Sequence, residues 1–76
     1  MESRQNESMR VAAQVGERIK AARMAAGLSA EDLAERLGTT KTTVCKWERA
    51  VHWPTAPQMV AIAAALGVDV GSLYES

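Results

Sequence analysis

The connection between two short predicted helices in the middle of the chain constrains the fold most. Apolar residues recur at helical spacing in residues 30–37 and again in the segment after Thr40, yet only Gly38 and Thr39 lie between the two segments. Two short helices joined so closely form a helix-turn-helix, in which the second helix projects and the first braces it. The sequence therefore predicts that the stretch TTKTTVCKWE (residues 39–48) is the projecting helix and contacts a partner.

The rest of the chain is also predicted to be helical, because its apolar residues recur every three or four positions and do not alternate as in strands. A first helix over about 9–26 ends at Gly27, a fourth covers about 56–66, and a short one follows Asp69. Ser29, Thr40 and Thr55 are the predicted helix caps. The residues expected to face the core are Val11, Val15, Ile19, Ala22, Ala26, Leu33, Ala34, Leu37, Val44, Trp47, Val51, Met59, Ile62, Ala63 and Leu66, and the last short helix carries Leu73 and Tyr74. This pattern predicts a compact all-α fold with five helices.

Length and charge limit the organisation and the partners. The 76 residues are enough for one domain, for which we expect a flexible polar tail over residues 1–8 and a folded unit over 9–76. Basic and acidic residues balance at nine each, but residues 36–53 hold four basic residues against one acidic residue. Because no apolar run could cross a bilayer and the first ten residues are too polar for a secretory signal, we expect a cytoplasmic protein with no membrane partner.

Catalytic and metal-binding functions find no support in the sequence. Cys45 is the only cysteine and His52 the only histidine, so neither an internal disulfide nor a Cys/His zinc site can be assembled within one chain. We also find no paired base and nucleophile and no glycine-rich phosphate loop. We therefore expect no enzyme activity, no metal and no cofactor.

Five segments follow one another in a distinctive order and spacing: GERIKAAR (16–23), GLSAEDLAERLG (27–38), TTKTTVCKWE (39–48), Pro54-Thr55 and AAALGV (63–68). In this respect the chain resembles the Cro/C1-type helix-turn-helix domain, or Xre family, from Gly16 to about Tyr74. The resemblance implies a lambda-repressor-like five-helix bundle that places its third helix in the major groove of double-stranded DNA. It also implies a bacterial or phage transcriptional regulator, most simply a repressor, that associates with the nucleoid.

Three features depart from the family pattern. Ala30 stands where the family often has a glutamine that can reach a phosphate. Ala50 stands where a glycine commonly follows the third helix, and since a left-handed conformation is sterically costly for alanine, that helix should run on or end differently. The loop VHWP (51–54) replaces basic residues that usually flank the duplex backbone. These departures bear on affinity and docking more than on fold.

At 100° per residue the third helix divides into two faces, with Val44, Trp47, Glu48 and Val51 on the inner face. The opposite face carries lysines, which can donate to guanine or phosphates, and threonines, whose methyl group suits thymine. A solvated helix face explains these charges as well as DNA binding does when the helical pattern is taken alone, and the family resemblance favours DNA. The predicted DNA-binding residues are Thr39, Thr40, Lys41, Thr42, Cys45, Lys46, Arg49 and His52.

Glu48 lies on the inner face of the third helix, where an unpaired carboxylate is costly. Arg23 lies at the edge of the buried face of the first helix and can reach it, and the family resemblance implies the same pairing. We therefore predict a salt bridge between Arg23 and Glu48 that is at least partly buried and fixes the angle of the third helix.

Assembly and one alternative function stay open. DNA binding implies a weak homodimer, or a dimer that forms on an inverted-repeat operator, with Val51 and Trp53 as candidate contacts. Packing of both side chains onto the fourth helix explains them equally well. The alternative function is a protein-interaction module, such as an antitoxin or anti-repressor subunit. Neutral charge, Ala30 and the apolar VHW loop favour it.

Overall fold

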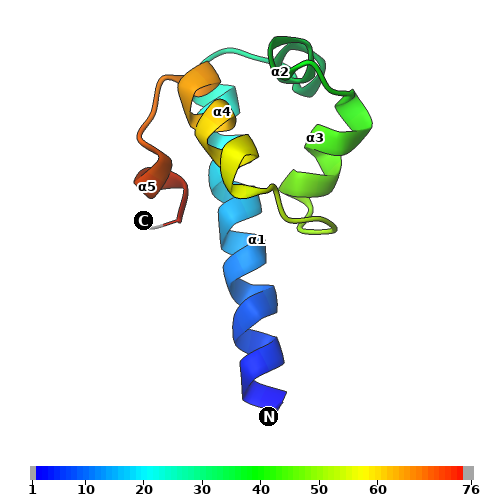
Figure 1. Ribbon diagram of the computed structural model, residues 1–76, viewed down its shortest axis with the longest axis vertical. Coiled ribbons are helices and arrows are strands. Elements are labelled where there is room, and N and C mark those ends of the chain that lie inside the picture. The colour runs from blue at the N-terminus through cyan, green and yellow to red at the C-terminus, as the bar shows by residue number, and fades with distance from the viewer. Residues whose placement is uncertain (1, 75–76) are drawn as a thin grey trace.

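The computed structural model describes residues 2–74, which form five helices and no strand (Figure 1). The helices are α1 (Glu2–Ala25), α2 (Ala30–Leu37), α3 (Lys41–Glu48), α4 (Ala56–Leu66) and α5 (Val70–Tyr74). The predicted all-α fold with five helices is confirmed, and α2 and α4 have the predicted bounds. Residues 1, 75 and 76, which belong to the predicted tail and domain, lie outside the described range. None of the described helices is long and apolar enough to cross a membrane.

The first helix is longer than predicted. It begins at Glu2 instead of about residue 9, so the backbone of residues 2–8 continues α1 and the predicted boundary at residue 9 is not a helix end. These residues lack apolar periodicity, but they contain no glycine or proline, and extending an existing helix costs far less than nucleating one. The N-terminal half of α1 extends beyond the other four helices, and the longest extent of the molecule is 39 Å (Figure 1).

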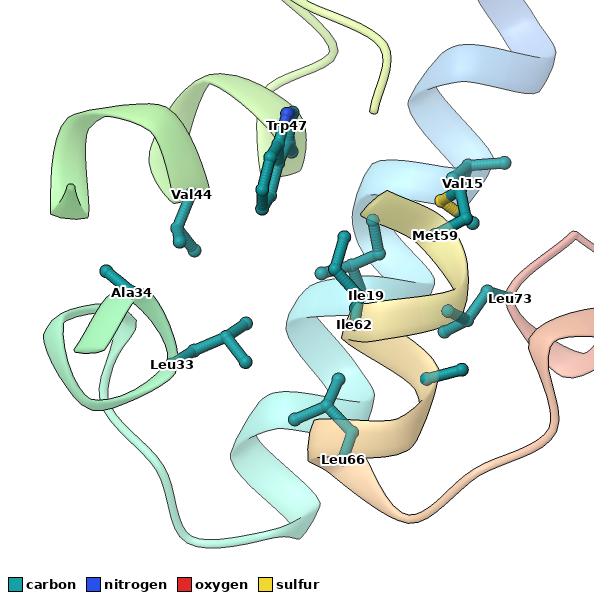
Figure 2. Close-up of a cluster of buried hydrophobic side chains, with 11 residues drawn as sticks. Val15, Ile19, Leu33, Ala34, Val44, Trp47, Met59, Ile62, Leu66 and Leu73 are labelled. Carbon is teal, nitrogen blue, oxygen red and sulfur yellow. The ribbon is translucent and has the colours of Figure 1, made fainter. Parts of the chain in front are cut away.

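All five helices contribute to one hydrophobic core (Figure 2). Trp47 points into it from α3 and is 4% exposed, which confirms it as a core residue. The predicted core face of α4 is confirmed in full. The core consists of Val15, Ile19, Leu33, Ala34, Val44, Trp47, Met59, Ile62, Ala63, Leu66 and Leu73.

Three residues predicted to face the core do not. Val11 is 41% exposed and its neighbour Ala12 is buried instead, because the loop that follows α3 lies beside Ala12. Ala26 is exposed, since it lies just beyond the end of α1. Val51 is 59% exposed because α3 ends at Glu48, after which the helical projection no longer gives the direction of a side chain.

The turn between α2 and α3 depends on one glycine and one cap. Gly38 adopts the left-handed conformation, with φ 68°, and ends α2, while the Thr39 amide donates to the Ala34 carbonyl at 2.9 Å. The Thr40 hydroxyl then accepts a hydrogen bond from the Thr43 amide at 3.2 Å, which confirms the predicted cap of α3. The two helices are therefore joined without a flexible linker.

Gly16 brings α1 and α3 into close contact. A Cβ atom at this position would lie 2.5 Å from the Glu48 carbonyl oxygen and 2.7 Å from that of Trp47, closer than real Cβ atoms approach. Both oxygens belong to the backbone, so neither can move unless the end of α3 moves. Gly16 therefore sets the separation between α1 and the C-terminal end of α3.

We predict that Gly16→Ala lowers the free energy of unfolding by about 2 kcal/mol, because the overpacking outweighs the gain in helix propensity. Urea titration measures the change. Gly71→Ala is the matched control, since its Cβ would meet no described atom within 4 Å, and it should leave stability unchanged or slightly raised. A Gly16→Ala protein as stable as the wild type would show that the close approach is not required.

Candidate nucleic-acid interface

The exposed side of α3 forms an open concavity that gathers five of the eight residues predicted to bind DNA. They are Lys41, Thr42, Cys45, Lys46 and Arg49. Four of these side chains are exposed, and Cys45 is half-buried. The lining contains three cationic side chains, and no acidic side chain of the described residues lines it.

The other three predicted residues lie elsewhere. Thr39 is half-buried and lines a separate small recess with Leu37, Trp47, Gln58 and Ala61, between α3 and α4. The Thr40 hydroxyl caps α3 and lies 3.0 Å from the Thr43 hydroxyl, so its hydrogen-bonding capacity is largely used within the domain. His52 is exposed in the loop and does not line the concavity.

Val51 is a sixth residue of the concavity, and helical periodicity had placed it on the opposite face. The chain reverses at the end of α3, where the Ala50 amide donates to the Trp47 carbonyl at 3.1 Å and the Val51 amide to the Lys46 carbonyl at 2.8 Å. These two bonds are those of a helix C-cap that requires a left-handed residue, and Ala50 has φ 62°. The signal in the sequence was the family's glycine position, occupied here by Ala50.

Arg23 and Glu48 form the predicted salt bridge. Arg23 Nε lies 2.7 Å from Glu48 Oε2 and Nη2 lies 3.1 Å from Oε1, so the pair is bidentate. The side chains are only 12% and 8% exposed. Arg23 Nη1 also donates to the Leu28 carbonyl at 2.9 Å. The hydrogen bonds to Glu48 raise the pKa of Arg23 and so favour its charged form further.

Trp53 lies beside α1 and is 48% exposed. It lines an open groove with Met9, Ala12, Ala13, Arg49 and Ala50. The two candidate dimer contacts, Val51 and Trp53, therefore lie on different surfaces. Arg49 is the residue that borders both.

A family model described as helix-turn-helix matches residues 19–73. The chain belongs to the Cro/C1-type helix-turn-helix family. No curated protein matches the sequence.

Solved structures with this helix-turn-helix fold include the DNA-binding domain of BldD from S. venezulae. That domain is 26% identical with a TM-score of 0.78, and the match covers 87% of this chain and 99% of that chain. Hydroxypropylphosphonic acid epoxidase from S. wedmorenis is 30% identical with a TM-score of 0.79. The match covers 86% of this chain but only 35% of the epoxidase, so the likeness is limited to about a third of that enzyme.

The helix-turn-helix domain keeps its usual α3 ending despite the alanine at position 50. Of the two outcomes expected from the sequence, a longer helix or a different ending, neither occurs, because α3 stops at Glu48 and Ala50 adopts the left-handed conformation. A left-handed alanine costs about 1 to 2 kcal/mol. The carbonyl oxygens of Glu48 and Trp47 pack against Gly16, which holds this end of α3 close to α1.

We predict that Glu48→Gln lowers the free energy of unfolding by about 3 kcal/mol, because it leaves the Arg23 guanidinium largely buried without its counter-charge. Thermal and urea unfolding measure the loss. Glu35→Gln, the same change on an exposed residue of α2, should alter stability by less than about 0.5 kcal/mol. Equal melting temperatures for the two variants would show that the salt bridge is exposed or absent in solution.

Proposed function

We propose that this helix-turn-helix domain binds double-stranded DNA and acts as a transcriptional regulator, with α3 in the major groove. The observation that carries the proposal is the concavity on α3, where three cationic side chains surround a surface free of acidic residues among those described. Membership of the family and the likeness to the DNA-binding domain of BldD support it.

The placement of Glu48 also supports DNA binding. Glu48 is the only acidic residue between positions 36 and 53, and its carboxylate is turned inward onto Arg23. Lys41, Lys46 and Arg49 therefore act together on the exposed side of a chain whose formal net charge is zero. Such a local cluster attracts phosphates, and phosphate contacts provide most of the sequence-independent affinity for DNA.

In the proposed complex, Lys46 and Thr42 approach base edges from the exposed face of α3. Lys41, at the start of the helix, and Arg49, at its end, contact phosphates on either side. His52 approaches the sugar-phosphate backbone of the DNA from the loop that follows α3. Occupation of an operator in this way represses transcription most simply by excluding other proteins from the site.

We predict that Lys46→Ala weakens binding to a duplex selected from a random pool by roughly 1 to 3 kcal/mol and relaxes the preference at one base pair. Band-shift titrations at several salt concentrations measure both the affinity and its salt slope.

Lys20→Ala removes an exposed lysine from α1 and serves as the matched control, with unchanged affinity expected. A uniform loss over all sequences would assign Lys46 to a phosphate. If neither Lys41→Ala nor Lys46→Ala changes affinity, the groove model is wrong. Absence of duplex binding at low salt would instead favour the protein-interaction module.

We further propose that two copies bind an inverted-repeat operator, with half-sites about 34 Å apart. A single α3 contacts few base pairs, so pairing on DNA is an economical route to affinity. Trp53 and Met9, which is 70% exposed, form an apolar surface beside the concavity that a second copy could cover.

Sedimentation of the complex should find two proteins on a symmetric duplex, whereas the free protein should be a monomer or a weak dimer. Trp53→Ala should reduce cooperative binding, and Val60→Ala, which truncates an exposed residue of α4, should not. One protein per duplex at saturation would overturn the paired model. Unchanged cooperativity in Trp53→Ala would remove Trp53 from the interface.

A further inference from the structure

The concavity on α3 is partly apolar. Besides its three cations it is lined by Thr42, Cys45 and Val51. Cys45 is half-buried, and Val51 is 59% exposed. A valine offers no hydrogen bond, and a thiol is only a weak donor. These two residues therefore add little to the recognition of phosphates or of polar base edges.

Val51 is held in this position by the backbone. Its amide donates to the Lys46 carbonyl at 2.8 Å, and the left-handed conformation of Ala50 turns the chain back toward α3. The His52 amide donates to the same carbonyl at 3.3 Å. In Figure 1 the loop after α3 turns back below the end of that helix. The exposed valine thus belongs to an anchored turn, which gives a contact surface a fixed shape.

The major groove presents one apolar group, the C5-methyl of thymine. We propose that Cys45 and Val51, together with the Thr42 methyl, form a contact for this methyl group, so that the domain distinguishes thymine from cytosine at one position of each half-site. This inference rests on the proposed DNA binding through α3.

The cationic side chains around this contact also favour a thymine methyl group as the group that is bound there. Lys41, Lys46 and Arg49 line the same concavity, so a duplex held there by its phosphates brings its base edges to the apolar residues. A protein partner with an apolar side chain would not need these three cations. A methyl group on a polyanionic duplex satisfies both the apolar and the cationic parts of the surface.

The test removes only the methyl group. In the duplex selected by the wild-type protein, each thymine is replaced singly by deoxyuridine, and affinity is measured by band shift. We expect one position per half-site at which the loss is about three- to fivefold, as the burial of one methyl group implies. At that position, 5-methylcytosine should bind more tightly than cytosine by a similar factor, because it carries the same methyl group.

Two isosteric changes then assign the contact to this surface. In the Cys45→Ser, Val51→Thr double variant, which leaves only threonine methyl groups on this surface, the ratio of affinities for thymine and deoxyuridine should fall clearly below the wild-type ratio, whatever the change in affinity for the deoxyuridine duplex. Val60→Thr is the matched control, because Val60 on α4 is also 59% exposed, and it should keep the full ratio. Circular dichroism checks that each variant is folded.

The outcomes separate this inference from the proposed function. If the wild-type protein binds its selected duplex but no thymine is sensitive to loss of its methyl group, the inference is overturned and DNA binding stands. The same conclusion follows if the double variant keeps the full ratio. If no duplex is bound at low salt, the proposed function fails and the methyl contact fails with it.

Discussion

The bidentate pair between Arg23 and Glu48 is the interaction on which the position of α3 depends. It joins the C-terminal end of α3 to the end of α1, and the same guanidinium also holds the Leu28 carbonyl in the connection to α2. The backbone of Glu48 is also held against α1, because its carbonyl lies against Gly16. A largely buried ion pair contributes less to net stability than its geometry suggests, since both charges lose hydration. Its main effect here is to fix one orientation of α3 relative to the core.

The same pair determines the electrostatics of the exposed surface. With Glu48 turned inward, all the charged side chains that line the concavity on α3 are cationic, although the chain as a whole carries equal numbers of opposite charges. Interactions with a duplex act over about one Debye length, so the local arrangement of charge matters more than the sum over the chain. A neutral composition is therefore compatible with a DNA-binding surface. One carboxylate exposed among Lys41, Lys46 and Arg49 would weaken it considerably.

The sequence predicted correctly those helices whose two ends are set by capping residues and glycines next to them in the chain. Ser29 and Thr55 cap α2 and α4, Gly38 and Gly67 end them, and both helices have the predicted bounds. The start of α1 was missed because a polar helix extended from a packed one has no periodic pattern. Thr39 and Val51 could not be placed from the sequence, since the recess around Thr39 depends on how α4 packs and the direction of Val51 depends on the turn at Ala50. Local chemistry thus predicts helices well, whereas the shape of the surface between them depends on contacts distant in sequence.

Four consecutive residues at the end of α3 have both a structural role and a role in the proposed function. Glu48 anchors the helix, Arg49 borders both the concavity and the groove beside Trp53, Ala50 makes the left-handed turn, and Val51 completes the concavity. Glycine at position 50 would relieve the steric cost of this turn but would also leave the chain there more freedom. With alanine, fewer backbone conformations are available once the packing around Gly16 has fixed the end of the helix. In the proposed complex, the base contacts and the pairing of two copies would therefore depend on the same rigid turn. Because the end of α3 packs against α1, the position of α1 would in turn determine where the DNA-binding surface lies.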